Sequence, residues 1–133
     1  MARPDSDLPA AELEVLKTLW DESPATVRDV MNRLHERGRK LAYTTVLTFL
    51  TRLEQKGYVR SDKSGLAYAY SPKVTREKVS RSRLKSLLQE LYDGAAAPLV
   101  LQLVRDERFT PDEISALQKL IDQFDGKPRR SRK

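Results

Sequence analysis

Apolar residues recur at helical spacing in six stretches of the chain, and one short stretch between the third and the fourth alternates instead. In the first stretch, residues 10–21, the leucines and Trp20 lie three or four positions apart, which is the spacing of one helix face. Residues 26–38 and 43–56 repeat this pattern. The sequence therefore predicts three short helices before Gly57.

Residues typical of helix ends lie at the boundaries of these stretches. Thr26 can cap the second predicted helix, and Asp29 follows three positions later, as in a capping box. Gly38 and Gly57 lie where the second and third helices should end, a position that favours glycine. The capping pattern and the apolar spacing thus indicate the same boundaries.

Residues 58–70 (YVRSDKSGLAYAY) alternate in the manner of a β-hairpin and turn at Lys63-Ser64-Gly65, and Pro72 ends the hairpin. Tyr68 and Tyr70 are expected to pack against the helices rather than to stack on bases. Three short helices followed by a hairpin are the order of a winged helix-turn-helix domain, in which the third helix is the recognition helix and the hairpin is the wing.

The predicted third helix has a polar face of threonines where most exposed helix faces have Glu and Lys. At about 100° per residue, four threonines, Arg52 and Gln55 share a sector of roughly 120°. Threonine is a mediocre helix former, so helix propensity does not require it here. Hydroxyls can bond to base edges and threonine methyl groups can touch thymine. The face favours a contact with the major groove; a solvated, threonine-rich surface is the alternative interpretation.

Basic residues lie close to this face in the sequence and could contact phosphates without reading the base sequence. They include Arg28 and Arg33 on the second predicted helix, and Arg37 in the turn before the third. Each alone could be an ordinary surface charge, so their grouping is the stronger signal. The candidate DNA-binding residues are Arg28, Arg39, Lys40, Tyr43, Thr44, Thr45, Thr48, Thr51, Arg52, Arg60 and Lys63.

The second half is predicted to form three more helices, over about residues 75–93, 95–105 and 110–124, the last beginning with a Thr110 cap. These helices have more apolar surface than they can easily bury among themselves. Pairing with a second copy would bury it, usually with two-fold symmetry; packing back on the first half is the alternative. The candidate dimerisation residues are Leu84, Leu87, Leu91, Leu99, Val100, Leu103, Ile114, Leu117, Leu120 and Ile121.

These patterns together predict a mainly α protein with a small β-hairpin. A winged helix-turn-helix DNA-binding domain covers residues 1–74, with a frayed start, and a C-terminal helical dimerisation region covers residues 75–124. Residues 125–133 form a basic tail that is expected to be disordered, since nothing in it can be buried. The tail could serve solubility or make a weak electrostatic contact to polyanions.

Composition narrows the class of function. The 133 residues are 39% apolar, with no stretch long enough to span a membrane and no signal-peptide pattern, so we expect a soluble cytoplasmic protein without membrane insertion. With no cysteine, one histidine (His35) and no Gly-rich phosphate loop, we expect no metal site, no cofactor and no enzyme activity. A winged-helix module that binds protein instead of DNA is the alternative, but acidic residues on the third helix, which would favour it, are nearly absent.

The sequence resembles the penicillinase-repressor family (BlaI/MecI/CopY type) over about residues 8–124. The resemblance lies in LPAAELEVLKTLWDESPATVRDVMNRL, LAYTTVLTFLTRLEQKGYV and AYAYSP, and extends through LYDGAAAPLVLQLV. The E-x-E-V-L-x-x-L-W and Y-T-T-V-x-T-x-L-x-R-L motifs are specific in combination. The resemblance implies a bacterial repressor that binds dyad operator DNA as a homodimer, with a connection to antibiotic resistance.

The resemblance also implies how the repressor is released. Members of the family are cleaved on a signal from a membrane sensor with a metalloprotease domain, or they bind copper through C-terminal cysteines. The absence of cysteine from this chain excludes the copper mechanism. Lactam-responsive members are cut between Asn and Phe, and the matching pair here, Gln102-Leu103, is the candidate cleavage site although its residue types differ.

Overall fold

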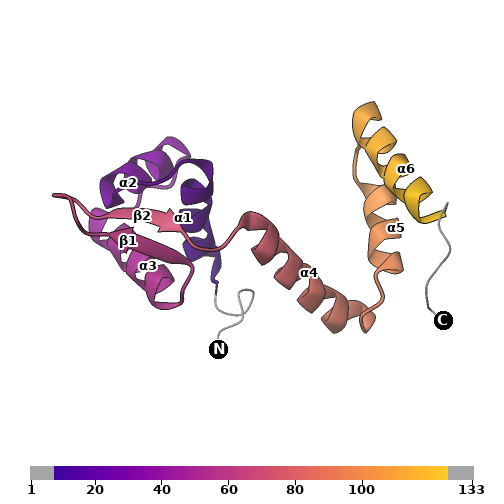
Figure 1. The fold of residues 1–133 in the computed structure, drawn as a ribbon, viewed down its shortest axis with the longest axis horizontal. Helices are drawn as coiled ribbons and strands as arrows, with labels where there is room; N and C mark the ends of the chain where they lie inside the picture. The colour runs from indigo at the N-terminus through magenta and orange to yellow at the C-terminus, as the bar shows by residue number, and fades with distance from the viewer. Residues whose placement is uncertain (1–7, 126–133) are drawn as a thin grey trace. The chain divides into compact units, whose positions relative to one another are not determined.

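The computed structural model describes residues 8–125, which form six α-helices and one two-stranded antiparallel sheet (Figure 1). The elements are α1 (Ala10–Asp21), α2 (Val27–Glu36), α3 (Tyr43–Gln55), β1 (Val59–Asp62), β2 (Ala69–Pro72), α4 (Arg76–Tyr92), α5 (Ala97–Asp106) and α6 (Pro111–Asp125). The predicted helices and hairpin are confirmed, with ends that differ by a residue or two. The predicted frayed start and residues 126–133 of the predicted tail (residues 125–133) lie outside the described residues. Asp125, the first residue of that predicted tail, is instead the last residue of α6.

The chain divides into two compact units, Met1–Leu87 and Leu88–Lys133, and α4 runs through the division. The predicted boundary at residue 74 between a DNA-binding and a dimerisation region concerns function and stays a prediction. Within residues 8–125, no helix is both long and apolar enough to cross a membrane.

The first unit has one apolar core to which α1, α2, α3 and the hairpin all contribute (Figure 1). The cluster includes the fully buried Val15, Val30 and Leu50, one from each of the three helices. The hairpin joins the core through Val59 and Tyr70. The backbone of Ala25, just before α2, pairs with that of Tyr70 in β2 as an antiparallel bridge. This bridge anchors the wing to the helices.

Both α2 and α3 end in the same hydrogen-bonded turn, with a glycine at positive φ. At the end of α3, Gly57 has φ +88°, its N–H donates to Glu54 O, and the N–H of Tyr58 donates to Leu53 O. Gly38, with φ +86°, ends α2 in the same way. Side chains other than glycine are disfavoured at this φ, so the two glycines fix where each helix stops. The third helix is thereby confined to Tyr43–Gln55.

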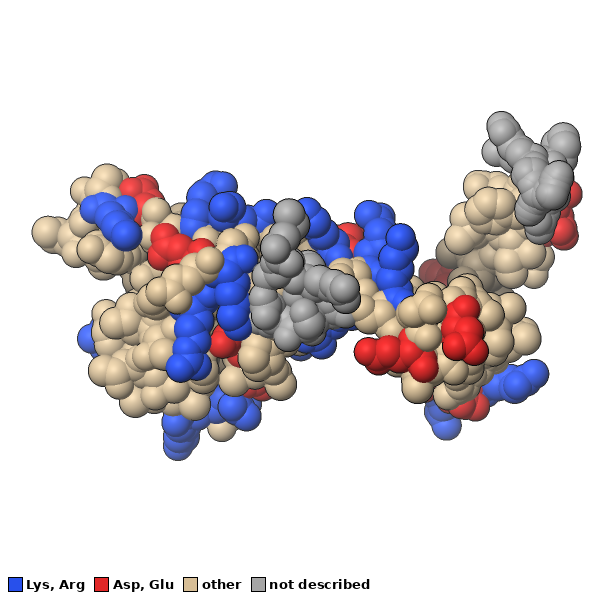
Figure 2. All heavy atoms as spheres, turned by 90° about the horizontal axis from the view of Figure 1, so that it is seen from below, with Lys and Arg blue, Asp and Glu red and all other residues tan. Residues whose placement is uncertain are grey.

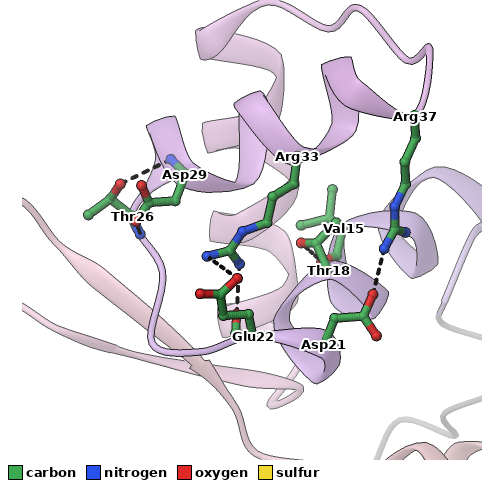
Figure 3. A network of polar contacts seen from close by, with 8 residues as sticks. All are labelled: Val15, Thr18, Asp21, Glu22, Thr26, Asp29, Arg33 and Arg37. Atoms are coloured by element: carbon green, nitrogen blue, oxygen red, sulfur yellow. Dashed lines mark hydrogen bonds and ion pairs between the residues drawn. The ribbon is translucent and has the colours of Figure 1, made fainter.

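The predicted capping box of α2 is confirmed, and ion pairs connect α2 and its C-terminal turn to the end of α1 (Figure 3). The N–H of Asp29 donates to Thr26 Oγ1 at 3.1 Å, and the N–H of Thr26 donates to Asp29 Oδ2 at 3.0 Å. Arg33 pairs with Glu22, and Arg37 pairs with Asp21. The contact between α1 and α2 thus has ion pairs in addition to its buried apolar side chains.

The second unit contains the end of α4 with α5 and α6. Tyr92 Oη donates to Gln102 Oε1 at 2.9 Å, which connects α4 to α5. A capping box begins α6: the N–H of Glu113 donates to Thr110 Oγ1, and the N–H of Thr110 donates to Glu113 Oε1. No residue of α5 or α6 is buried, and most of their large apolar side chains are exposed.

Candidate nucleic-acid interface

The third helix buries one side and exposes its threonines on the other. Val46, Leu50 and Leu53 have no exposed surface, and they hold α3 against the core. Of the four threonines in the predicted sector, Thr44, Thr48 and Thr51 are exposed and Thr45 is half-buried. Arg52 and Gln55 complete the exposed sector. The amphipathic division expected from the sequence is therefore present, and the threonine face is free to meet a ligand.

The hydroxyl of Thr48 already has an acceptor within the helix. Its Oγ1 donates to Thr44 O, one turn earlier, at 2.9 Å. The hydroxyl hydrogen is then used, but Thr48 is exposed and its Oγ1 can still accept a hydrogen bond. In this state Thr48 can accept a hydrogen bond from an amino group of adenine or cytosine, or touch a thymine methyl group.

The acidic residue of α3 is turned away from this face. Glu54 is half-buried and accepts a hydrogen bond from Ser61 Oγ of β1 at 2.7 Å. The carboxylate is thereby held toward the wing strand, as its position outside the predicted sector suggests. A polyanion that approaches the threonine face meets hydroxyls, an amide and a guanidinium, and no repulsive charge from α3 itself.

A cleft of about 480 Å³ lies beside the threonine face, between the start of α2, the start of α3 and the wing. Leu47 and Tyr43 form its helix side, and Leu66 and Tyr68 form its wing side. All four side chains are exposed, and Leu66 at the hairpin tip is fully so. Leu47 is not among the residues predicted for this face, although it is on the edge of the polar sector when the helix is drawn at about 100° per residue. Its position beside the threonines could have indicated that it belongs to the same surface.

The basic residues near α3 fall into two groups. Arg33 pairs with Glu22, directly after α1, Arg37 pairs with Asp21 at the end of α1, and Arg39 pairs with Glu14 of α1 at 3.2 Å. The other candidates form no ion pair with an acidic residue of the described chain: Arg28, Lys40, Arg52, Arg60 and Lys63. The cations of the second group are available to bind phosphates, whereas those of the first group form ion pairs within the fold. Arg39 belongs to the first group, although its role with DNA stays a prediction.

Two cations of the second group lie over aromatic rings. The guanidinium of Arg28 is 5.6 Å from the centre of the Tyr43 ring, and the ammonium of Lys63 is 5.4 Å from that of Tyr68. Hydrogen bonds from Ser64 hold the pKa of Asp62, in the wing turn, below its usual range. Asp62 is therefore ionised at neutral pH, and Lys63 next to it offsets its charge. The ring contacts restrict the two cations to the rims of the cleft.

Charge is divided unevenly between the two units. Residues 8–87 contain 16 Lys and Arg against 9 Asp and Glu, a net charge of +7, while residues 88–125 contain 3 against 8, a net charge of −5. Blue spheres accordingly crowd the winged-helix part of Figure 2. Within residues 8–125, no three His, Cys, Asp or Glu side chains are grouped to hold a metal ion. The positive potential therefore belongs to the unit that exposes the threonine face.

The helix order, the anchored wing and the exposed third helix define a winged helix-turn-helix protein of the DNA-binding repressor class. The sequence model of the penicillinase repressor family matches residues 8–123. The chain therefore belongs to the penicillinase repressor family.

Named relatives agree with this membership. The chain is 33% identical over 116 residues to the transcriptional regulator BlaI of Mycobacterium tuberculosis, with 86% of this chain and 82% of the relative covered. It is 26% identical over 113 residues to the penicillinase repressor of Bacillus licheniformis, covering 85% and 88%. The solution structure of the DNA-binding domain of the repressor BlaI matches with a TM-score of 0.50 and 28% identity, over 58% of this chain and 90% of that one.

Proposed function

We propose that this chain represses transcription in the cytoplasm by binding a dyad operator as a homodimer, with no enzyme activity of its own. In this proposal α3 enters the major groove, Thr44, Thr45, Thr48 and Thr51 meet base edges, and Arg52, Arg60 and Lys63 meet phosphates. The observation that carries the proposal is the exposed, acid-free threonine face of α3, together with nearby cations that form no ion pair with an acidic residue among residues 8–125. Such a face suits base contact, since hydroxyls lose little on leaving water if the base edges replace their hydrogen bonds.

A matched pair of variants tests base reading against phosphate binding. Thr48→Val keeps the shape and removes the hydroxyl, so it should weaken operator binding by on the order of 1 kcal/mol and leave random DNA unaffected. Arg60→Ala should weaken both DNAs alike and reduce the salt slope by about one unit. If both variants change binding to operator and random DNA equally, α3 does not read bases. If the wild-type chain prefers no DNA sequence, binding to a protein becomes the better explanation of the function of this winged-helix domain.

The proposed homodimer rests on the apolar surface of the second unit. On α5, Val100 and Leu103 are about half exposed, and on α6 Ile114, Leu120 and Ile121 are too. Apolar area exposed on this scale is typical of an interface. Leu117→Asp would place a carboxylate within the contact, so it should give monomers in sedimentation that keep weak half-site binding. A dimer that survives this change would place the interface elsewhere.

The proposed release is a cut in α5 by a membrane sensor metalloprotease. The candidate bond, Gln102-Leu103, lies inside a ten-residue helix whose N-cap residue, Ala96, makes no side-chain capping bond. A protease needs an extended chain, and a short helix without a capping bond opens more readily than a long one. The cut would separate α6 from the rest of the chain and weaken the two-site contact with DNA. Mass spectrometry of the repressor from induced cells tests this: an intact chain alongside derepressed genes would rule out proteolysis.

A further inference from the structure

A groove with apolar walls lies between α1 and the first half of α4, within the winged-helix unit. Its volume is about 420 Å³, and Leu13, Trp20, Val79, Leu84 and Leu87 form most of its walls. Leu84 and Leu87 are 46% and 37% exposed, so the α4 wall is open to water. A groove between two helices with exposed leucines is the kind of surface into which a third, amphipathic helix packs.

The charged residues that line this groove are all basic. Lys17, Arg76 and Arg83 line it, and no acidic residue does. Arg76 stacks its guanidinium 5.4 Å from the centre of the Trp20 ring. Arg83 donates from Nη2 to Leu8 O at 2.7 Å, but its buried Nε has no hydrogen-bond acceptor in the described chain. A helix that fits the groove should therefore present an apolar stripe with carboxylates beside it.

The last helix, α6, has this pattern. Ile114, Leu117, Ile121 and Phe124 follow one another at spacings of three, four and three, and all are exposed. At about 100° per residue, Asp122 and Asp125 fall on one flank of this stripe, and Lys119 falls on the opposite side of the helix. The other exposed apolar helix, α5, has one acidic residue, Asp106 at its end. The charge pattern therefore matches α6 to the groove and not α5.

We propose that the groove between α1 and α4 receives α6 of a second copy of this chain. The proposal rests on the proposed homodimer and adds to it, because it makes the winged-helix unit part of the dimer contact. Opposite net charges on residues 8–87 and 88–125 favour such a reciprocal exchange. Two-fold symmetry would form the contact twice per dimer. Loss of α6 would then free both α1–α4 grooves as well as separate the C-terminal helices.

Engineered cysteines test the contact directly, since the chain has no cysteine of its own. The variant Lys17→Cys/Asp122→Cys should oxidise to a covalent dimer on a non-reducing gel. The matched control, Lys17→Cys/Lys119→Cys, has its second thiol on the far side of α6 and should oxidise far more slowly. Charge reversal provides an independent readout: Lys17→Glu or Asp122→Lys alone should weaken dimerisation on the order of tenfold, and the two together should restore it.

The outcomes separate this inference from the homodimer itself. If sedimentation shows a dimer but the two cysteine variants cross-link equally, the groove is not the α6 site and the homodimer proposal stands. If the first variant gives only an internally cross-linked monomer, the chain's own α6 occupies the groove and the inference is wrong. Charge reversals that leave the dimer affinity unchanged would also overturn the inference that α6 binds in the groove. That result is expected if the groove binds a small amphipathic anion instead. A wild-type chain that sediments as a monomer overturns both proposals.

Discussion

The side-chain ammonium of Lys56, the residue that follows α3, donates to the buried carboxylate of Glu12 on α1 at 2.8 Å. Glu12 is only 3% exposed, although carboxylates are seldom buried to this extent. The pair joins residues 44 positions apart and ties the C-terminal end of α3 to α1. The direction in which α3 presents its threonines therefore depends on a polar contact as well as on the apolar core.

Removing the cation of this pair should cost more than removing both charges. Lys56→Met leaves Glu12 buried without its cation, and we expect the free energy of unfolding to fall by about 2 to 3 kcal/mol. The double variant Glu12→Leu/Lys56→Met should recover much of that loss. Lys85→Met, at an exposed position of α4, is the control and should change stability by less than about 0.5 kcal/mol. Urea unfolding of the four proteins measures this, and equal losses from the single and the double variant would contradict it.

Acid should weaken the start of α2. Hydrogen bonds from Thr26, the backbone N–H first, hold the pKa of Asp29 below its usual range. Because the folded pKa is lower than the unfolded one, this contribution is present above the ordinary pKa of about 4 and is lost as the pH falls through the folded value. Asp29→Asn should therefore destabilise the protein at pH 7 by about 0.5 kcal/mol, and the difference should shrink toward pH 2.5. A difference that stays constant over this range, measured by urea unfolding, would contradict the role of the charge.

Alkali should act at Tyr70. Burial raises the pKa of this phenol, and the nearby charge of Glu54 raises it further. The raised folded pKa means that stability is complete below the unfolded pKa of about 10 and declines as the pH rises through the folded value. Tyr70→Phe should therefore lose less stability than the wild type between pH 9 and pH 11. Thermal unfolding in that pH range checks this. An equal loss of stability in the wild type and in Tyr70→Phe would assign the effect to other groups.

Helices and turns could be predicted because their signals are local. The Thr26 capping box and the glycines at the ends of α2 and α3 act within a few residues, so sequence spacing was sufficient to place them. The exposed side of α3 followed in the same way from the helical period. Local sequence signals were therefore sufficient to predict most of the fold and the exposure of the threonine face of α3.

The pairing of charges could not be predicted, because it depends on which helices meet in space. Arg33, Arg37 and Arg39 have the same sequence context as unpaired cations, but each finds a carboxylate at the α1–α2 contact or on α1. The tyrosines of the wing also differ. Tyr70 is buried as predicted, whereas Tyr68, just before β2, lines the cleft with Tyr43 and Leu47 of α3 and stays half exposed beside Lys63. Strand alternation does not extend beyond the paired residues.

Selection of DNA from a random library by the whole chain tests the central claim most directly, because it assumes no operator. The account predicts that the wild-type chain enriches one sequence, in two inverted copies, at a spacing set by the dimer. Thr48→Val should enrich a sequence that is relaxed at the same position of each copy, and Arg60→Ala should enrich the wild-type sequence with weaker affinity. No enrichment by the wild type, or an unchanged sequence with Thr48→Val, would contradict the claim that the threonine face of α3 reads DNA.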